Sequence, residues 1–307
     1  MYRVIQCSHK IQELNYSKGD EHMNNIPENI EHMFKRIVRL KSKMDRNKAV
    51  SELLKVPEYN KEFLLRLRTE YSTNKTENVS VVTCTNKPQF IENIILNYIN
   101  QTWINKELIL ILNKNDLDIH YYQEKITHYK NIFIYQLPEE TSLGSCYNFA
   151  AKKTNYDYIA TFDDDDFYAP NYITDLMHAF QYTDADIVGK LSYFIYFEDK
   201  EILAIRNPYQ EYKYLDSTSF LDGGKKIVKK KVLDTVQYRD VSLLEDVYFC
   251  QDSIEKGFKI FSADKYNLAY LRRINKENHT WKEQDDTILK WCSVVTDKPP
   301  FKHNILV

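Results

Sequence analysis

The chain has 307 residues, which is long for a single domain, and 43% of them are hydrophobic. A chain of this length and composition can bury a substantial core, so it is neither disordered nor fibrous. Its 42 basic and 44 acidic residues leave a formal net charge of -2, which excludes an overall field that would draw the protein onto nucleic acid.

The five cysteines are widely spaced and form no C-x-x-C pair, so we expect reduced thiols rather than disulfides or a zinc site. Neither the first twenty residues nor any later stretch has the apolar length of a signal peptide or a membrane span. We therefore expect a cytoplasmic protein with no membrane span. The abundance of Lys, Asn, Ile and Tyr points to a bacterial source with an AT-rich genome.

Residues 1–75 are predicted to form a helical N-terminal arm. After Pro27, apolar residues recur at helical spacing as far as Met44, interrupted by Lys41. Two shorter helical segments follow, one that ends before Pro57 and one that carries Phe63. The polar stretch 71–78 then marks a domain boundary. Two interpretations stay open for the arm, a cap packed on the main domain and a surface for homo-oligomer formation.

From residue 79 onward, short apolar strands alternate with helices, which predicts a mostly parallel sheet flanked by helices over residues 76–307. In such sheets ligands bind beyond the carboxyl ends of the strands, so functional residues are expected directly after strands. The strands are expected at 79–84, 107–112, 131–136, 158–162, 186–196 and 201–205. The helices are expected after Pro88, at about 119–129, at about 145–153 and from Pro170 to about Phe180, with a C-terminal tail from about 282.

Four consecutive aspartates, Asp163 to Asp166, directly follow the strand at 158–162. Adjacent carboxylates repel one another, and their pKa values rise unless a cation neutralises them. Mg²⁺ and Mn²⁺ prefer oxygen ligands and are commonly held by one or two carboxylates together with water and substrate phosphates. The run therefore predicts a divalent-metal site for a diphosphate. A solvated acidic loop or a calcium loop is the alternative, but the EF-hand spacing is missing.

This region resembles glycosyltransferase family 2, in which a strand is followed by a D-x-D-type motif, an aromatic residue and a proline. The first strand with Thr83 and Pro88, the Asn-Gln-Thr-Trp segment at 100–103, and Gly144 with Asn148 are also similar to that family. The resemblance covers about residues 79–279. It implies an α/β fold of the GT-A (Rossmann-like) type, with a mixed, mostly parallel sheet and a helical N-terminal extension. It also implies a nucleotide-sugar donor with Mn²⁺ or Mg²⁺.

The same resemblance implies roles for single residues of this chain. Asp163 would contact the donor ribose and the metal, and Asp165 would bind the metal. Asp164 is a further candidate for binding the donor, and Asp166 would support the metal ligands from behind. His279 is a third candidate metal ligand, because a histidine completes the metal shell in many GT-A enzymes. The other candidates for binding the donor are Thr83, Thr85, Asn86, Pro88, Asn113, Asn148, Gly223, Gly224, Arg272 and Arg273.

A second acidic element, Glu245-Asp246, opens a predicted helix and resembles the E-D element of the family. An inverting transfer needs a carboxylate that takes the proton from the acceptor hydroxyl, while the metal stabilises the departing nucleoside diphosphate. We assign the base to Asp246, with Glu245 orienting it or contacting the acceptor. The alternative is that both acids only stabilise the N-terminus of a helix.

Two departures from the family pattern concern the nucleotide. The family's D-D-G-S is replaced by Asn-Lys-Asn-Asp at 113–116, and Asn113 can donate as well as accept hydrogen bonds. The frequent A-R-N of the family is Cys-Tyr-Asn at 146–148, without the arginine. Uridine is favoured as the nucleoside of the donor, with guanosine and thymidine left open.

The sequence thus predicts metal-dependent transfer of a sugar from a nucleoside diphosphate sugar, with a UDP-sugar favoured, to an unknown glycan, lipid-linked or peptide acceptor with inversion. Cell-surface polysaccharide synthesis is one setting for it. The acceptor would be selected by residues 191–224, which include Tyr209, Tyr212 and Tyr214. A nucleotidyltransferase is one alternative, although residues 83–88 contain no glycine-rich phosphate loop. A catalytically silent binding or structural protein of the same fold is the other.

Overall fold

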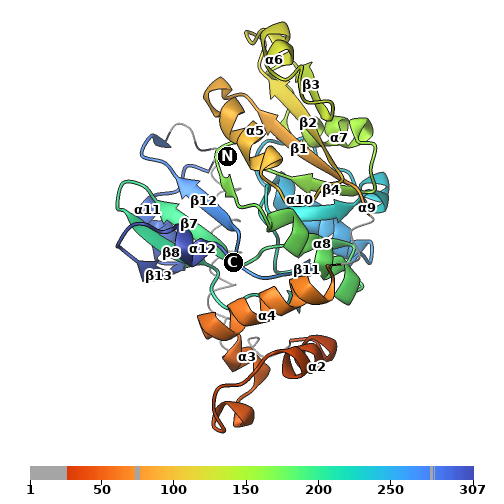
Figure 1. The fold of residues 1–307 in the computed structure, drawn as a ribbon. Helices are drawn as coiled ribbons and strands as arrows, with labels where there is room; N and C mark the ends of the chain where they lie inside the picture. Colours follow the sequence, from red (N-terminus) through yellow and green to blue (C-terminus); the bar gives the residue numbers. More distant parts are fainter. Residues whose placement is uncertain (1–25, 73–76, 277–278, 280) are drawn as a thin grey trace.

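A computed structural model describes residues 26–72, 77–276, 279 and 281–307 (Figure 1). It contains an eight-stranded sheet, a five-stranded sheet beside it, and a group of helices from the N-terminal arm at one end. Residues 1–25 of the predicted arm and its boundary near residue 75 lie outside the described residues.

The arm consists of α2 (Glu28–Ile37), the 3-10 helix η1 (Asp45–Asn47), α3 (Val50–Leu53) and α4 (Pro57–Glu70). The prediction that the first of these helices continues to Met44 was wrong. Val38 is already extended, and it joins the core beside α2 and α3. Three residues later, the backbone N–H of Lys41 donates to the Tyr59 hydroxyl of α4 at 3.0 Å. Contacts with α3 and α4 thus replace the last turns of the helix, and Met44 remains 77% exposed.

Helix α4 attaches the arm to α8 (Tyr172–Tyr182) of the main body. Nε and Nη2 of Arg68 donate to the two carboxylate oxygens of Asp175 at 2.6 and 2.9 Å. Nη1 of Arg68 donates to the carbonyl of Val307 at 2.5 Å. Phe34 and Phe63 belong to the same core cluster as the large sheet. The described helices therefore pack as a cap would, while homo-oligomer formation and the domain boundary stay predictions.

The large sheet has the order β3-β2-β1-β4-β10-β6-β11-β9. Its first four strands are parallel and lie within one residue of the predicted ends. They are β1 (Val79–Thr85), β2 (Lys106–Asn113), β3 (Ile132–Leu137) and β4 (Tyr158–Thr161). The helices between them are η2 (Pro88–Phe90), α5 (Ile91–Ile99), α6 (Ile119–Lys125) and α7 (Leu143–Lys153). Two hydrophobic clusters cover the two faces of the sheet, one with α5 and α8 and the other with α7.

The rest of the large sheet is mixed, because β10 runs antiparallel to both of its neighbours, β4 and β6. The remaining strands of this sheet are β6 (Ile187–Gly189), β9 (Lys213–Tyr214), β10 (Lys226–Lys229) and β11 (Ile260–Ser262). The helices of this half are α9 (Lys230–Thr235) and α10 (Glu245–Glu255).

The predicted strand 186–196 is two strands in different sheets. β6 ends at Gly189, and β7 (Tyr193–Phe197) enters the smaller sheet, whose order is β13-β8-β7-β12-β5. The chain crosses between the sheets at Lys190, whose buried ammonium lies 2.9 Å from Asp264 Oδ1. The smaller sheet also contains β5 (Phe167–Tyr168), β8 (Ile202–Arg206), β12 (Leu268–Arg272) and β13 (Cys292–Thr296).

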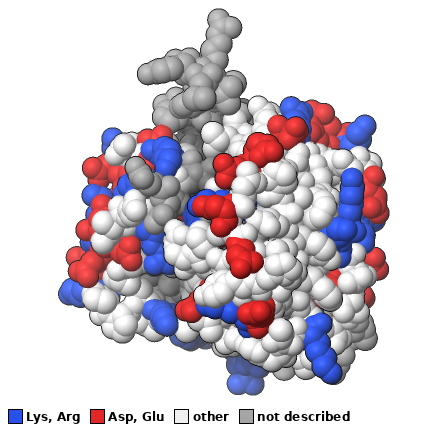
Figure 2. Space-filling model, turned by 90° about the horizontal axis from the view of Figure 1, so that it is seen from above, with Lys and Arg blue, Asp and Glu red and all other residues white. Residues whose placement is uncertain are grey.

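The residues after 282 return to the body of the protein. Helix α11 (Asp285–Leu289) leads to β13, which pairs with β8, and α12 (Lys302–Ile305) places Ile305 beside Leu64 of α4. Among the described residues, no helix is long and apolar enough to cross a membrane. On the face shown in Figure 2, basic and acidic side chains are interspersed, in agreement with the near-zero net charge.

Candidate active site

The acidic run forms a loop between β4 and β5 whose ends are held together by two aromatic rings. Phe162 and Tyr168 stack with their ring centroids 3.9 Å apart and their planes at 3°. The backbone N–H of Asp163 donates to the Tyr168 hydroxyl at 2.7 Å, and this hydroxyl donates to the carbonyl of Gly224 at 2.8 Å. Tyr168 therefore fixes the position at which the acidic run leaves the sheet.

Two asparagines of α5 hold the main chain of this loop. The Asn93 side-chain amide donates to the carbonyls of Asp164 and Asp166 at 2.8 and 3.0 Å. One turn later, Asn97 donates to the carbonyl of Asp166 at 2.8 Å and accepts from the N–H of Tyr168 at 3.2 Å. Side chains four residues apart lie on one face of a helix, so α5 meets the loop with both amides.

Lys87 neutralises the middle of the run from the turn after β1. Its ammonium lies 3.1 Å from Asp164 Oδ1 and 3.2 Å from Asp165 Oδ2. The Thr85 hydroxyl donates to the other oxygen of Asp164 at 2.6 Å. Burial and the neighbouring Asp165 raise the pKa of Asp164 to about 6, while Lys87 and Thr85 act in the opposite direction.

Asp166 points away from solvent, and its side chain is 0% exposed. Its Oδ2 lies 3.4 Å from the Lys225 ammonium, and its Oδ1 accepts from the backbone N–H of Leu271 at 3.0 Å. Burial raises the pKa of Asp166, and Lys225 opposes that rise by stabilising the anion. This carboxylate is thus occupied by protein partners.

The turn at Gly223 and Gly224 brings the acidic run and the Glu245-Asp246 element together. A Cβ added at Gly223 would lie 3.6 Å from Asp163 Oδ1 and 3.8 Å from Glu245 Oε1. A Cβ at Gly224 would lie 2.5 Å from Asp163 Cγ and from the Tyr168 hydroxyl. The absent Cβ at Gly224 therefore lets the turn approach Asp163 closely, and Gly223 lies beside carboxylates from two distant parts of the sequence.

Glu245 and Asp246 open α10 after Leu244, whose φ is 65°. Burial, and then the charge of Asp246, raise the pKa of Glu245 to about 8. Burial also raises the pKa of Asp246 to about 6, and the charge of Lys226 opposes this shift. The Lys226 ammonium donates to the carbonyls of Asp222 and Gly223 at 3.2 and 3.0 Å, so it also fixes the glycine turn.

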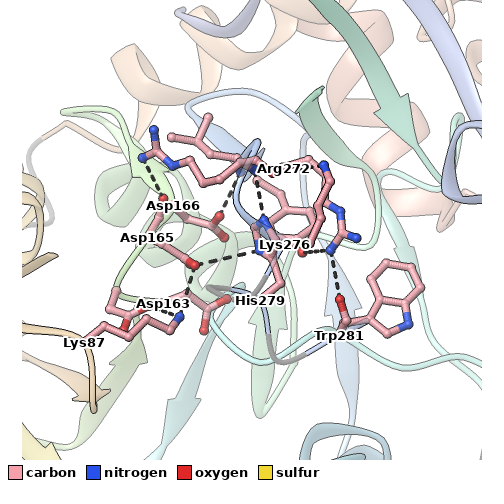
Figure 3. A network of polar contacts seen from close by, with 12 residues as sticks. Lys87, Asp163, Asp165, Asp166, Arg272, Lys276, His279 and Trp281 are labelled. Carbon is pink, nitrogen blue, oxygen red and sulfur yellow. Dashed lines mark hydrogen bonds and ion pairs between the residues drawn. The ribbon is translucent and has the colours of Figure 1, made fainter. Parts of the chain in front are cut away.

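His279 lies beside Asp165, with Nδ1 3.9 Å from Oδ2 (Figure 3). Its Nε2 accepts from the backbone N–H of Arg273 at 2.9 Å. Burial and the charge of Arg272 lower the pKa of His279 to about 4, so the ring is neutral and carries its proton on Nδ1. Nδ1 is therefore the nitrogen that faces Asp165, and the role of His279 as a metal ligand stays a prediction.

The side chains of the adjacent residues Arg272 and Arg273 point in different directions. Arg272 is 1% exposed and points toward Trp281, where its guanidinium donates to the carbonyl of Trp281 at 2.9 Å and to Asp285 at 2.8 Å (Figure 3). The structure does not bring Arg272 to the acidic loop, because its guanidinium is enclosed by these partners. Arg273 instead donates to the carbonyl of Asp165 at 3.2 Å and stays at the acidic loop.

The remaining predicted donor-binding residues lie at or near the ends of β1, β2 and α7. Thr83 is buried within β1, whereas Asn86 and Pro88 are exposed in the turn beside Lys87. The Asn113 amide nitrogen donates to the carbonyl of Pro138 at 2.6 Å, which leaves its oxygen as an acceptor. Asn148 is committed elsewhere, since it donates to the carbonyl of Tyr238 and accepts from its N–H. Asn148 therefore positions the chain before α10 rather than the donor.

The tyrosines predicted to select the acceptor do not gather at this site. Tyr212 is 0% exposed, and its hydroxyl donates to Asn60 Oδ1 at 3.2 Å. Tyr214 belongs to β9, the edge strand that is separated from β4 by β10, β6 and β11. Tyr209 is 45% exposed but lies near Lys55 of the N-terminal helices. These tyrosines were predicted to face the acceptor because they lie in the segment 191–224. The strand order of the sheet instead positions them away from the aspartates.

The side chains of the site could hold a divalent cation only if a bound diphosphate supplied further oxygen ligands. In the part of the chain that the structure describes, no three His, Cys, Asp or Glu side chains converge as a closed metal site. Asp163 is the most exposed of the four aspartates, at 31%, and Asp165 pairs with the partly exposed Lys87. Mg²⁺ and Mn²⁺ are commonly held by one or two carboxylates plus phosphates, which this arrangement allows.

A family model described as glycosyl transferase family 2 matches residues 80–236, just over half of the chain. The chain belongs to this family. It has the GT-A fold, as the sequence predicted. No curated protein matches it.

Two solved structures show the extent of the likeness. The mannosyltransferase PcManGT from Pyrobaculum calidifontis, in complex with GDP-Man and Mn²⁺, is 11% identical, with a TM-score of 0.52 over 81% of this family 2 chain and 70% of that one. S. aureus TarS 1–349, in complex with UDP-GlcNAc, is 16% identical with a TM-score of 0.49. The match covers 64% of this chain and 59% of that TarS chain, so it spans less than two thirds of TarS 1–349.

Four residues of the site escaped the sequence analysis. Lys87 and Lys225 neutralise the aspartates, and Asn93 and Asn97 hold their main chain. The spacing of the asparagines on a predicted helix was a usable signal, because polar amides among the apolar residues of α5 need buried partners. Lys225 carried no such signal, since it opens a run of lysines that reads as a solvated surface.

Proposed function

We propose that this family 2 protein transfers a sugar from a nucleoside diphosphate sugar to an acceptor hydroxyl, with a divalent cation and with inversion at the anomeric carbon. The observation that carries the proposal is the glycine turn, where a Cβ added at Gly223 would lie near both Asp163 Oδ1 and Glu245 Oε1, at 3.6 and 3.8 Å. A carboxylate proposed to bind the metal and a carboxylate of the Glu245-Asp246 element thereby lie at one turn, within reach of one donor molecule.

Asp163 and Asp165 would hold the cation together with the donor diphosphate. Bound there, Mn²⁺ or Mg²⁺ would neutralise the charge that develops on the leaving diphosphate. Lys87 and Arg273 add positive charge at the same loop. The architecture of PcManGT, whose structure contains GDP-Man and Mn²⁺, supports this assignment.

Asp246 would take the proton from the acceptor hydroxyl. Its pKa of about 6 leaves it ionised at neutral pH yet basic enough to accept a proton, which suits a general base. Glu245, with a pKa of about 8, is mostly protonated at neutral pH and can donate a hydrogen bond to the acceptor or to Asp246. The two acids, adjacent in sequence, thus have different tasks.

Asn113 would read the base of the nucleotide. Because its amide nitrogen is bonded to the Pro138 carbonyl, its oxygen is presented as an acceptor. An acceptor at this point suits the ring N–H of uracil, thymine or guanine. Cytosine has no hydrogen on that ring nitrogen and offers only its exocyclic amino group as a donor, so UDP-sugars stay the favoured donors and CDP-sugars are less favoured.

A catalytically silent protein with the same fold is the competing function. Calorimetric titration of UDP, GDP, dTDP and CDP with and without Mn²⁺ separates the two. We expect Mn²⁺-dependent binding of UDP, weak or absent binding of CDP, and a loss of about 10- to 100-fold in affinity for Asp165→Asn. A matched control is Asp252→Asn, in a surface ion pair with Arg239. Failure of all four nucleotides to bind would contradict the transferase proposal.

A further inference from the structure

Lys225 contacts two carboxylates of the acidic loop, which are the least and the most exposed of the four. Its ammonium lies 3.2 Å from Asp163 Oδ2 and 3.4 Å from Asp166 Oδ2. The Lys225 side chain is 5% exposed, that of Asp166 is 0% exposed, and that of Asp163 is 31% exposed. The ammonium therefore joins the most deeply buried aspartate of the loop to the one that solvent reaches most easily.

The ammonium is fixed by more than these two carboxylates. It lies 5.1 and 5.2 Å from the ring centroids of Tyr193 and Tyr270, on strands β7 and β12. Asp166 is itself fixed, because its second oxygen accepts from the backbone N–H of Leu271 on β12. Contacts from both strands thus hold the Asp166–Lys225 pair at a set position.

Neutralising a buried aspartate does not by itself explain this arrangement. A buried counter-ion needs one carboxylate partner, and Asp166 meets that need. The second contact goes to Asp163, whose carboxyl group is confined on another side by Gly224, where an added Cβ would lie 2.5 Å from Asp163 Cγ. Lys225 and Gly224 together thus restrict the position of the Asp163 carboxylate.

We propose that Asp166 and Lys225 form a buried relay that positions Asp163 for the donor. Asp166 holds the ammonium, and the ammonium holds the carboxylate that would bind the donor's cation. Lys225 is therefore a positioning residue that acts through Asp163. This inference rests on the proposed function, since it gives Asp163 its role at the donor.

The test compares Asp166→Asn with the double variant Lys225→Met/Asp166→Asn, in which both members of the buried pair are neutral. Lys225→Met alone leaves Asp166 buried without its cation and is prone to unfold, so the double variant carries the test. We measure thermal unfolding and, by calorimetry, Mn²⁺-dependent binding of UDP, GDP, dTDP and CDP. Lys229→Met is the matched control, because this lysine of β10 lies away from the acidic loop, where it donates to the carbonyl of Ala185 at 2.7 Å and lies 5.3 Å from the centroid of the Phe180 ring.

We expect Asp166→Asn to weaken nucleotide binding by less than tenfold, because the ammonium loses its buried anchor but can still reach Asp163. The double variant should unfold near the same temperature and yet bind the nucleotide about 10- to 100-fold more weakly, as is usual when a partner of a metal ligand is removed. Wild-type affinity in the double variant would overturn the relay and leave the proposed function intact. If the wild type binds no nucleotide, the proposed function fails and the relay fails with it.

Discussion

The acidic loop and the Glu245-Asp246 pair are carboxylate clusters that meet at one glycine turn, yet their surroundings differ. In the loop, the ammonium groups of Lys87 and Lys225 lie within 3.4 Å of carboxylate oxygens. At the pair, Lys226 acts from a distance, because its ammonium is bonded to main-chain carbonyls. Burial raises the pKa values in both clusters, to about 6 for Asp164 and Asp246 and to about 8 for Asp166 and Glu245. The clusters therefore differ in the lysines that contact their carboxylates and not in their pKa values.

The largest effect is expected at the Glu245-Asp246 pair, when the proposed base Asp246 is replaced. Asp246→Asn should slow the release of nucleoside diphosphate from the donor by about 10²- to 10⁴-fold, because the general base is lost. Nucleotide binding should persist, since the acidic loop is unchanged. The assay follows donor cleavage with water as the acceptor. Asp252→Asn, on the same helix, serves as the control, and equal losses in both variants would refute the assignment.

The glycine turn that joins the two clusters gives the next effect. Gly224→Ala should lower the free energy of unfolding by about 1–3 kcal/mol, because the new Cβ would overlap Asp163 and Tyr168. Gly223→Ala places its Cβ at ordinary contact distance and should change it by less than about 0.5 kcal/mol. Urea unfolding of the two variants measures this difference. Equal stability would mean that the turn is looser than the contacts imply.

The smallest effect is a pH dependence of donor cleavage, which tests whether Asp246 acts as the base. An aspartate acts as a base only when ionised, so the cleavage rate should fall about tenfold per pH unit below the Asp246 pKa of about 6. An aspartate with an ordinary pKa of about 3.9 would keep the rate constant down to roughly pH 4. The rate is measured from pH 4.5 to 8 with the nucleotide sugar saturating. A profile that is flat to pH 4.5 would remove Asp246 from the role.

The sequence predicted the central strands and the two acidic elements because their signals are local. Strands β1 to β4 are apolar runs bounded by helices, and Asp163 to Asp166 directly follow one of them. The contacts of Lys225 escaped prediction because they span 59 residues to Asp166 and depend on the antiparallel pairing of β10 with β4.

The sequence also could not show which polar side chains are buried and which reach the site. Arg272 and Arg273 are adjacent and chemically alike, but only Arg273 reaches the acidic loop, because successive residues at a strand end point to opposite sides. Tyr212 was predicted to face an acceptor, and it is instead enclosed by the N-terminal helices through Asn60 and Phe63. Which polar residue is enclosed is decided by packing between distant segments.

The central claim is that both carboxylate clusters act on one donor molecule, and a crystal structure with Mn²⁺ and an intact UDP-sugar tests it most directly. The account predicts the diphosphate and the cation at Asp163 and Asp165, with the sugar lying across Gly223 and its anomeric carbon facing Asp246. A diphosphate bound away from the acidic loop, or a sugar that points away from Glu245 and Asp246, would contradict it.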